Sequence, residues 1–239
     1  TLEVPVALDW QSRFGRSIIF KIADKNHEGY PDNCTTLITD KIIQAMPFSG
    51  QNSMGSDNER KYGSSHYLNS SINHWLNSNS KAGEWATDTG LPYGKPSWNS
   101  VESNPYALWA GFLAMLDSEF VTKLLDTNIK YCIKSSTYGV ADTYSFVTVK
   151  MFLAAVSEVA HSNYYSWPDE GTIIELFKSY SNSTYTTIEC AENNENTNSL
   201  FLPTTTAYSW WLRTPYSIYE TYVTSGSVSD SNDTRRCYY

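Results

Sequence analysis

The sequence predicts a single α+β domain built from short strands, short helices and long ordered loops. Apolar, β-branched runs bounded by turn residues, such as residues 17–22 and 36–39, are typical of short strands. Residues 67–78 instead space their large apolar side chains three and four apart, which indicates a short amphipathic helix. No repeat of fixed period and no change of composition divides the chain, so we expect residues 1–239 to form one domain.

The strands and helices are expected to be interspersed along the chain. Asp40 is placed to cap a helix that stops at Pro47, and either Ser70 or Ser71 is placed to cap the helix around Trp75. The other predicted elements are helices from Pro105 and Ser118 and strands over residues 4–8, 17–22, 36–39, 129–133 and 146–155.

Three long loops are expected to be inserted into this domain. Residues 49–65 are polar and contain glycine, and residues 179–205 are a polar segment rich in Asn and Thr. Residues 79–103 combine glycine and proline with Trp and Tyr. These aromatic residues indicate an ordered excursion held in place by its side chains, not a linker.

The composition favours an ordered protein and disfavours a nucleic-acid or membrane-inserted one. Aromatic residues make up 15% of the chain and charged residues 18%, which argues against intrinsic disorder. The net charge is −8, and the pair Arg235–Arg236 is too small to form a phosphate-binding stripe. The apolar runs are shorter than the ~20 residues that span a bilayer. The chain begins without an initiator Met or a signal peptide, which we interpret as a trimmed or processed segment.

The cysteines and the acidic residues do not predict a metal site or a cofactor. Four cysteines lie tens of residues apart, at Cys34, Cys132, Cys190 and Cys237. Because they lack metal-ligand spacing, we prefer buried or free thiols, with one or two disulfides as the alternative. Residues 230–233 carry oxygen ligands that calcium could use, but they lack the EF-hand loop pattern.

The sequence carries none of the common catalytic motifs, and we therefore expect no enzyme. GxSxG, HExxH, P-loop and GxGxxG patterns are all absent. Glu158 and His161 have the spacing of a surface pair on a helix, and Asp169–Glu170 lie in turn-like sequence, where solvated carboxylates are expected. His66 and His74 are interpreted as surface or capping histidines, not metal ligands.

The C-terminal stretch joins a rigid aromatic block to a polar tail. Residues 210–215, Trp-Trp-Leu-Arg-Thr-Pro, are expected to form a scaffold. Residues 216–233 are dominated by Tyr, Ser, Thr, Asn and Asp, a composition typical of a paratope, where Tyr gives stiff contact area and Ser and Asn give adaptable hydrogen bonds. Ser225-Gly226 predicts a two-residue hairpin turn between strands at 221–224 and 227–229. A solvated surface hairpin is the alternative.

Several blocks, taken together, resemble a known family. They are residues 19–31 (IFKIADKNHEGYP), 36–43 (TLITDKII), 62–63 (YG), 67–70 (YLNS), 75–78 (WLNS), 111–113 (GFL), 150–153 (KMFL) and 158–159 (EV), and, most specifically, 210–215 (WWLRTP). Their order and spacing are similar to phage- and prophage-borne proteins of gut bacteria and related viruses. The C-terminal half of those proteins is similar to the C-type lectin fold, in the version shared with formylglycine-generating enzyme.

This resemblance implies a C-type-lectin-like fold with small twisted antiparallel sheets, short flanking helices and long ordered loops. The same fold houses variable proteins of diversity-generating retroelements, in which adenine-directed mutagenesis rewrites a C-terminal, ligand-contacting stretch. Mutagenesis of AAC or AAT codons cannot yield Lys, Gln, Glu, Met or Trp, and over residues 214–239 only Glu220 belongs to that set. The resemblance therefore implies a variable ligand-binding region at about 208–239.

Two departures from the family pattern bear on this interpretation. The family's closing strand, Gly-Val-Arg-Pro-Ala-Leu, corresponds here to residues 234–239, which keep only the arginine, as Arg236. Nothing matches the copper-binding cysteine pair of formylglycine-generating enzyme, which weakens an oxidase interpretation.

The sequence and the resemblance together predict a non-catalytic receptor-binding or display protein on a virion tail or a cell surface. Its partner would be a protein or glycan ligand on a host or neighbouring cell. A formylglycine-generating-type enzyme and a structural virion domain are the alternatives. The expected ligand-contacting residues are Tyr216, Ser217, Tyr219, Tyr222, Thr224, Ser229, Asp230, Ser231, Asn232 and Asp233, above a scaffold of Trp210, Trp211, Leu212, Arg213 and Arg236.

Overall fold

The structure is a computed structural model that describes somewhat more than half of the chain. The described residues are 1–11, 15–40, 43, 46–48, 66–85, 109–133, 143–159, 168–178, 210–216, 219–224, 227–231 and 237–238. At residues 46–47, 210 and 216, and in the strands after residue 218, only the backbone is described. The expected loops 49–65 and 179–205, most of 79–103 and the start at Pro105 lie outside these residues.

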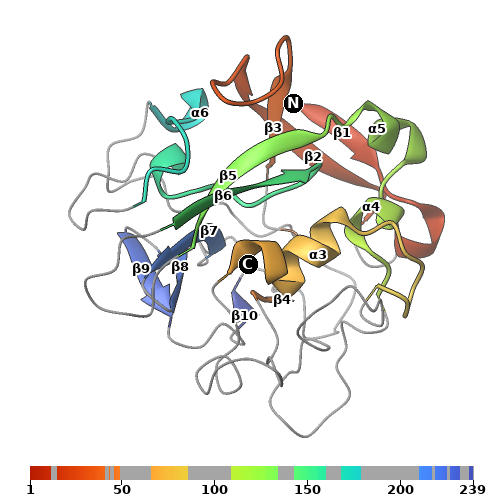
Figure 1. The fold of residues 1–239 in the computed structure, drawn as a ribbon. Helices are drawn as coiled ribbons and strands as arrows, with labels where there is room; N and C mark the ends of the chain where they lie inside the picture. Colours follow the sequence, from red (N-terminus) through yellow and green to blue (C-terminus); the bar gives the residue numbers. More distant parts are fainter. Residues whose placement is uncertain are drawn as a thin grey trace, which may run out of the picture.

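The N-terminal part folds into a three-stranded antiparallel sheet in the order β1-β2-β3 (Figure 1). Its strands are β1 (Leu2–Pro5), β2 (Ser17–Lys25) and β3 (Thr35–Thr39), which confirms the strands predicted at 17–22 and 36–39. The first strand ends earlier than predicted, because the chain turns into a 3₁₀ helix at Leu8–Trp10. A register shift between Ile22 and Asp24 interrupts the β2–β3 ladder.

The middle of the chain forms a regular antiparallel hairpin of β5 (Thr127–Ile133) and β6 (Thr143–Val149). The strand predicted at 146–155 therefore starts earlier and ends at Val149. The strand ends because of a contact with a residue distant in the sequence: the next two backbone N–H groups, of Lys150 and Met151, donate to Asn77 Oδ1 at 2.9 and 3.1 Å. A side chain of helix α3 thus takes the place of a strand partner.

The described helices are short and carry side-chain caps where the sequence offers them. In α3 (Ser71–Asn77) the cap is Ser70, whose Oγ accepts from Asn73 N at 3.2 Å. In α5 (Ser118–Lys123) the cap is Asp117, not the predicted Ser118, because Asp117 Oδ1 accepts from Phe120 N at 3.0 Å. The remaining described helices are α4 (Phe112–Met115), α6 (Glu175–Lys178) and the 3₁₀ helices Tyr67–Asn69 and Ser157–Val159.

The C-terminal part contains a second three-stranded antiparallel sheet, β7-β8-β9. Its strands are β7 (Trp210–Tyr216), β8 (Tyr219–Thr224) and β9 (Ser227–Ser231). Thr224 pairs with Ser227, on either side of the predicted turn, whose own residues 225–226 lie outside the described residues. The last strand, β10 (Cys237–Tyr238), pairs with β4 (Met46–Pro47). Residues 46–47 are therefore extended, which contradicts a helix continuing from Asp40 up to Pro47.

Two hydrophobic clusters meet at β7. The larger cluster contains Trp211 together with residues of β1, β2, α3, α4 and β5, and the smaller one contains Leu212 together with Ala23, Ile174 and Phe177. Neighbouring residues of a strand point to opposite faces, so β7 lies between the two clusters. In Figure 1 the β5–β6 hairpin runs between the N-terminal sheet and the β7–β9 sheet.

The fold is thus mixed α and β with small antiparallel sheets, which confirms the α+β class. In the described part of the chain, the helices lack the length and apolar character that crossing a membrane requires.

Candidate functional site

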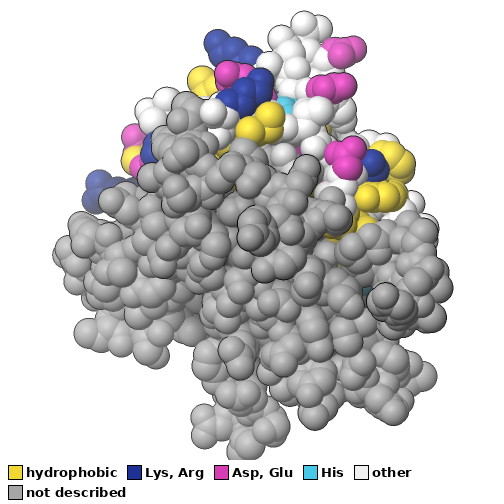
Figure 2. Space-filling model, turned by 90° about the vertical axis from the view of Figure 1, so that its left-hand side faces the viewer, with side chains coloured by type: hydrophobic (Ala, Val, Ile, Leu, Met, Phe, Trp, Pro, Cys, Tyr) yellow, Lys and Arg dark blue, Asp and Glu magenta, His cyan; other side chains and the backbone are white. Residues whose placement is uncertain are grey.

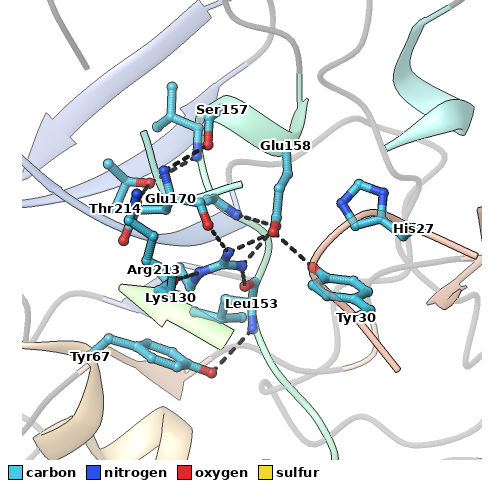
Figure 3. A network of polar contacts seen from close by, with 12 residues as sticks. His27, Tyr30, Tyr67, Lys130, Leu153, Ser157, Glu158, Glu170, Arg213 and Thr214 are labelled. Atoms are coloured by element: carbon cyan, nitrogen blue, oxygen red, sulfur yellow. Dashed lines mark hydrogen bonds and ion pairs between the residues drawn. The ribbon is translucent and has the colours of Figure 1, made fainter. Parts of the chain in front are cut away.

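Arg213 on β7 is fully buried and lies at the centre of a polar network (Figure 3). A guanidinium carries five N–H donors in a fixed fork, and here each finds an oxygen acceptor. The Glu158 oxygens accept from Nη1 at 2.7 Å and from Nη2 at 2.6 Å. The other acceptors are backbone carbonyl oxygens, those of Lys130 at 3.1 Å, Leu153 at 2.8 Å and Glu170 at 3.3 Å. The acceptors are thus one carboxylate and three backbone carbonyl oxygens.

Glu158 is the charged partner of Arg213 and is equally buried. Its Oε1 also accepts from the Tyr30 hydroxyl at 2.8 Å, and its Oε2 accepts from Ala155 N at 2.9 Å. Burial alone would raise the pKa of the Glu158 carboxyl, but the charge and hydrogen bonds of Arg213 outweigh burial and hold this pKa below its usual value. Burial would likewise lower the pKa of Arg213, but the Glu158 charge raises it. Both groups are therefore ionised.

The chain around Glu158 turns tightly enough to direct its carboxylate inward. Glu158 lies in the 3₁₀ helix Ser157–Val159, where its N–H donates to Ala155 O at 3.1 Å. Gly171 packs against the same side chain: a Cβ at that position would lie 2.7 Å from Glu158 Oε1. Real Cβ atoms essentially never come so close, so the network requires glycine here.

Glu170, the second buried carboxyl group, has different partners. Its Oε1 accepts from Cys132 N at 2.7 Å, and its Oε2 forms a short hydrogen bond with the Thr214 hydroxyl. Thr214 Oγ1 also accepts from Val156 N at 2.9 Å. Burial raises the pKa of Glu170; the charge of Arg213 and the hydrogen bond with Thr214 oppose this rise without cancelling it.

These side chains cover the edge of β5 that does not pair with β6. Residues 130 and 132 direct their backbone groups to the same edge of the strand. Arg213 Nε donates to Lys130 O, and Glu170 Oε1 accepts from Cys132 N. An unpaired backbone group is costly when buried. The side chains of Arg213 and Glu170 therefore take the place of a neighbouring strand at this edge.

An outer arm of the network reaches toward the N-terminal sheet. The ring of Tyr30 packs on that of His27, with the two centroids 4.5 Å apart (Figure 3). His27 Nδ1 lies 2.7 Å from Asp24 Oδ2, which also accepts from Glu175 N at 3.0 Å. Burial opposes ionisation of Asp24, but the hydrogen bonds from Glu175 and His27 hold its pKa below the usual value. Burial and the Glu158 charge raise the pKa of Tyr30, so its hydroxyl remains a donor.

The surface of the described residues offers a contrast. The ion pair between Lys178 and Glu175 spans 2.6 Å, but these side chains are 50% and 64% exposed. Figure 2 shows basic side chains (Lys or Arg), carboxylates and hydrophobic side chains mixed on one face of the described part. Exposed pairs of this kind contribute little to stability because water and salt screen them. The pair of Arg213 and Glu158, with both side chains at 0% exposure, is the strong electrostatic feature of the described structure.

The predicted scaffold residues are distributed as follows. Trp211, Leu212 and Arg213 are each at 0% exposure, and Thr214 is equally buried. The ring of Trp211 lies 5.5 Å from that of Phe48. Trp210 is placed by its backbone alone, and Arg236 lies outside the described residues.

The predicted ligand-contacting residues that the structure describes are spread along the β7–β9 ladder. Tyr222 pairs with both Trp211 and Ser229, and Thr221 in the next row pairs with Asp230. Tyr216, Tyr219, Thr224 and Ser231 are also placed by backbone only, and Ser217, Asn232 and Asp233 lie outside the described residues. The backbone pairing therefore places the described members of the set in neighbouring rows of one sheet.

Two sequence-based expectations about carboxylates are wrong. Glu158 and Glu170 were expected at a solvated surface, but they are 0% and 2% exposed. A usable signal existed: Glu158 is the one charged residue in the apolar run 151–160, and an arginine within a buried aromatic block needs an anionic partner. His27, Tyr30 and Thr214 carried no comparable signal.

The expectations for histidines and cysteines were met only in part. His66 occupies the N-cap position of the 3₁₀ helix Tyr67–Asn69, but without a side-chain capping bond, and its ring packs edge-on to Tyr131. The ring of His74 lies 6.4 Å from that of Trp85, so packing accounts for both histidines better than a surface position does. Cys34 is a free thiol, and the side chain of Cys132 is buried. The side chains of the other two cysteines are not described.

The fold and the network define an α+β protein whose two hydrophobic clusters are joined at a buried, arginine-centred polar junction. The chain belongs to DUF6273, a family of domains of unknown function, whose sequence pattern matches residues 33–239. Strands β1 and β2 and the side chains of Asp24, His27 and Tyr30 precede the matched residues. No curated protein and no solved structure matches the chain.

Proposed function

We propose that this protein is a non-catalytic recognition protein whose C-terminal hairpin, β8–β9, contacts a protein or glycan ligand. The proposal rests on the difference between β7 and the β8–β9 hairpin within the C-terminal sheet. Strand β7 is buried from residue 211 to 215 and anchored by Arg213. The hairpin is attached to that strand by its ladder, β8 to β7 and β9 to β8. A fixed strand thus carries a hairpin rich in Tyr, Ser and Thr.

This division suits a binding surface that changes its specificity. Substitutions in a hairpin that contributes little to the core leave the fold intact, whereas substitutions in a buried, hydrogen-bonded strand do not. Tyr supplies most of the binding energy in such surfaces, and truncation of an anchoring Tyr costs about 2 kcal/mol or more. The composition of residues 214–239 also fits diversification by adenine-directed mutagenesis, with Glu220 as the exception.

The proposed fold is C-type-lectin-like, and the proposed setting is a virion tail or a cell surface. Small antiparallel sheets, short helices and a closing strand support this fold. The closing strand is β10, which pairs with β4 although its sequence keeps little of the family pattern. The setting follows from the resemblance to phage-borne variable proteins.

A library experiment tests this proposal without knowledge of the natural ligand. Positions 219, 222, 229 and 230 are randomised on the displayed protein, and the library is selected against a defined target such as hen lysozyme. A matched control library randomises Tyr144, Phe146 and Thr148 on β6, which are solvent-exposed residues of another hairpin. We expect target-specific binders from the first library at a clearly higher frequency. Equal yields from the two libraries, or loss of folding in most members of the first, would contradict the proposal.

The natural specificity is tested on the unchanged chain. A glycan microarray and purified host-cell envelopes are probed with the wild-type protein and with the Tyr219→Ala/Tyr222→Ala variant. We expect a selective signal that the double variant loses while its thermal midpoint stays close to that of the wild type. A signal that the double variant keeps in full would instead favour a structural virion domain.

A further inference from the structure

We propose that Glu170 is a neutral carboxylic acid in the folded protein, with its proton in the hydrogen bond to Thr214 Oγ1. Glu158 and Glu170 both belong to the network of Arg213, but one guanidinium balances the charge of only one of them. Glu158 occupies the bidentate position, whereas Arg213 reaches Glu170 only at its backbone oxygen, at 3.3 Å. With Glu170 neutral, the buried cluster holds one cation and one anion.

The hydrogen bonds of the two carboxyl groups support this difference. An ionised carboxylate has about four lone-pair sites, and Glu158 fills them with two guanidinium bonds, the Tyr30 hydroxyl and Ala155 N. Glu170 has one backbone donor, Cys132 N, on Oε1 and one hydroxyl on Oε2. These partners fit a neutral acid: one oxygen accepts from the Cys132 N–H, and the proton shared with the Thr214 hydroxyl can reside on the other oxygen.

The groups that face Glu170 come from three elements. Strand β7 supplies Arg213 and Thr214, the 3₁₀ helix supplies Glu158 and the Ser157 hydroxyl, and β5 supplies the backbone and the buried side chain of Cys132. Within the described part of the chain, Arg213 is the only cation among them, and it is paired with Glu158. Desolvation raises the pKa of Glu170, and the nearby Glu158 charge adds to the rise.

The neutral state makes the junction between β5 and β7 sensitive to pH. An unfolded Glu ionises at about pH 4.3, whereas folded Glu170 keeps its proton above that pH. Between the two pKa values the folded chain binds more protons, so its stability is full below the unfolded pKa and falls as the pH rises toward the folded pKa. Ionised Glu170 would add a second buried negative charge beside Glu158 and withdraw the proton shared with Thr214. The titrating carboxyl group of Glu170 therefore contacts β7, the strand to which the β8–β9 hairpin is paired.

Infrared spectroscopy of the folded protein tests the protonation state directly. At about pH 7 an ordinary carboxyl group is ionised, so the carbonyl stretch of a protonated carboxyl group identifies a buried neutral acid. We expect this band in the wild type and in the matched Glu175→Gln control, whose side chain is 64% exposed, but not in Glu170→Gln. A wild-type spectrum without the band would overturn the proposal.

Unfolding as a function of pH provides the second test. The amide of Gln can donate to Thr214 and accept from Cys132, so it reproduces the neutral acid. We expect Glu170→Gln to fold, to bind about one proton fewer on folding at neutral pH than the wild type, and to lose the decline in stability that begins above the unfolded pKa of about 4.3. A Glu170→Gln variant that is unfolded at pH 7, or whose pH dependence matches that of the wild type, would also overturn the proposal.

Discussion

Glu158 and Glu170 both lie close to Arg213, but they differ in their hydrogen-bond partners and in the direction of their pKa shifts. The carboxylate of Glu158 faces the guanidinium fork, which holds its pKa low despite complete burial. The carboxyl group of Glu170 faces a backbone N–H and a hydroxyl, and burial raises its pKa. The comparison teaches that burial alone does not decide the charge of a carboxyl group. The direction in which the Arg213 guanidinium points decides which of the two carboxyl groups is ionised.

Removal of the guanidinium is expected to have the largest effect. Arg213→Met keeps the apolar stem but leaves Glu158 as a buried charge without a partner, so we expect a loss of about 3–5 kcal/mol in the free energy of unfolding. Urea unfolding followed by tryptophan fluorescence measures it. Lys21→Met removes a half-exposed ion pair with Asp40 and serves as the control, with an expected loss under about 0.5 kcal/mol. Similar losses in the two variants would show that Arg213 does not organise the core.

The next largest effect is expected at Glu158, and it depends on pH. Glu158→Gln leaves Arg213 without its anion, so we expect a loss of about 2–4 kcal/mol at pH 7. The folded pKa of Glu158 lies below its unfolded value, so its contribution is present above about pH 4.3 and is lost as the pH falls through the folded pKa. The difference between the wild type and the variant should therefore shrink on acidification. A difference that grows as the pH falls would contradict the assigned charge.

Gly171 gives a steric test of the Glu158 side of the comparison. A Cβ at position 171 would lie 2.7 Å from Glu158 Oε1, so we expect Gly171→Ala to cost about 1–3 kcal/mol. In a Glu158→Ala background the space is open, and the same substitution should cost much less. Unfolding of the two single variants and the double variant measures this coupling. Additive losses would mean that the two residues do not compete for the same space.

The smallest of these effects is expected at Tyr30. Tyr30→Phe removes one hydrogen bond to Glu158, made at 2.8 Å, while the other donors to Glu158 remain, so we expect a loss of about 1 kcal/mol. Tyr144→Phe is the matched control, because the Tyr144 hydroxyl accepts an exposed N–H from Asp169 at 3.2 Å. We expect that variant to stay within about 0.5 kcal/mol of the wild type. If the control loses as much as Tyr30→Phe, the outer arm of the network does not support Glu158.

Local sequence signals predicted the elements whose causes are themselves local. Examples are the cap of α3 at Ser70 and the strands around residues 17–22 and 36–39, which each depend on neighbouring residues. The end of β6 at Val149 depends instead on Asn77, a side chain far away in the sequence. For the same reason the extended conformation of residues 46–47, whose partner is β10, could not be read from local propensity.

Only the arginine at the centre of the site could be predicted from the sequence. An arginine within WWLRTP indicates a buried cation, and Arg213 is one. Its partners come from positions 130, 153, 158 and 170, which only the folded chain brings together. Asp169–Glu170 has the sequence of a turn, which by itself predicts solvation. The burial of Glu170 depends on long-range contacts with Cys132 and Thr214.

We propose that β7 is a fixed frame and that the sequence of the β8–β9 hairpin can change without loss of folding. Saturation mutagenesis of residues 210–231 on a displayed protein, scored by the retained folded fraction at each position, tests it most directly. We predict that nearly all substitutions at Trp211, Leu212, Arg213 and Thr214 abolish folding, and that most substitutions at residues 219–224 and 227–231 are tolerated. Equal intolerance in the two segments, or a tolerant Arg213, would contradict the account.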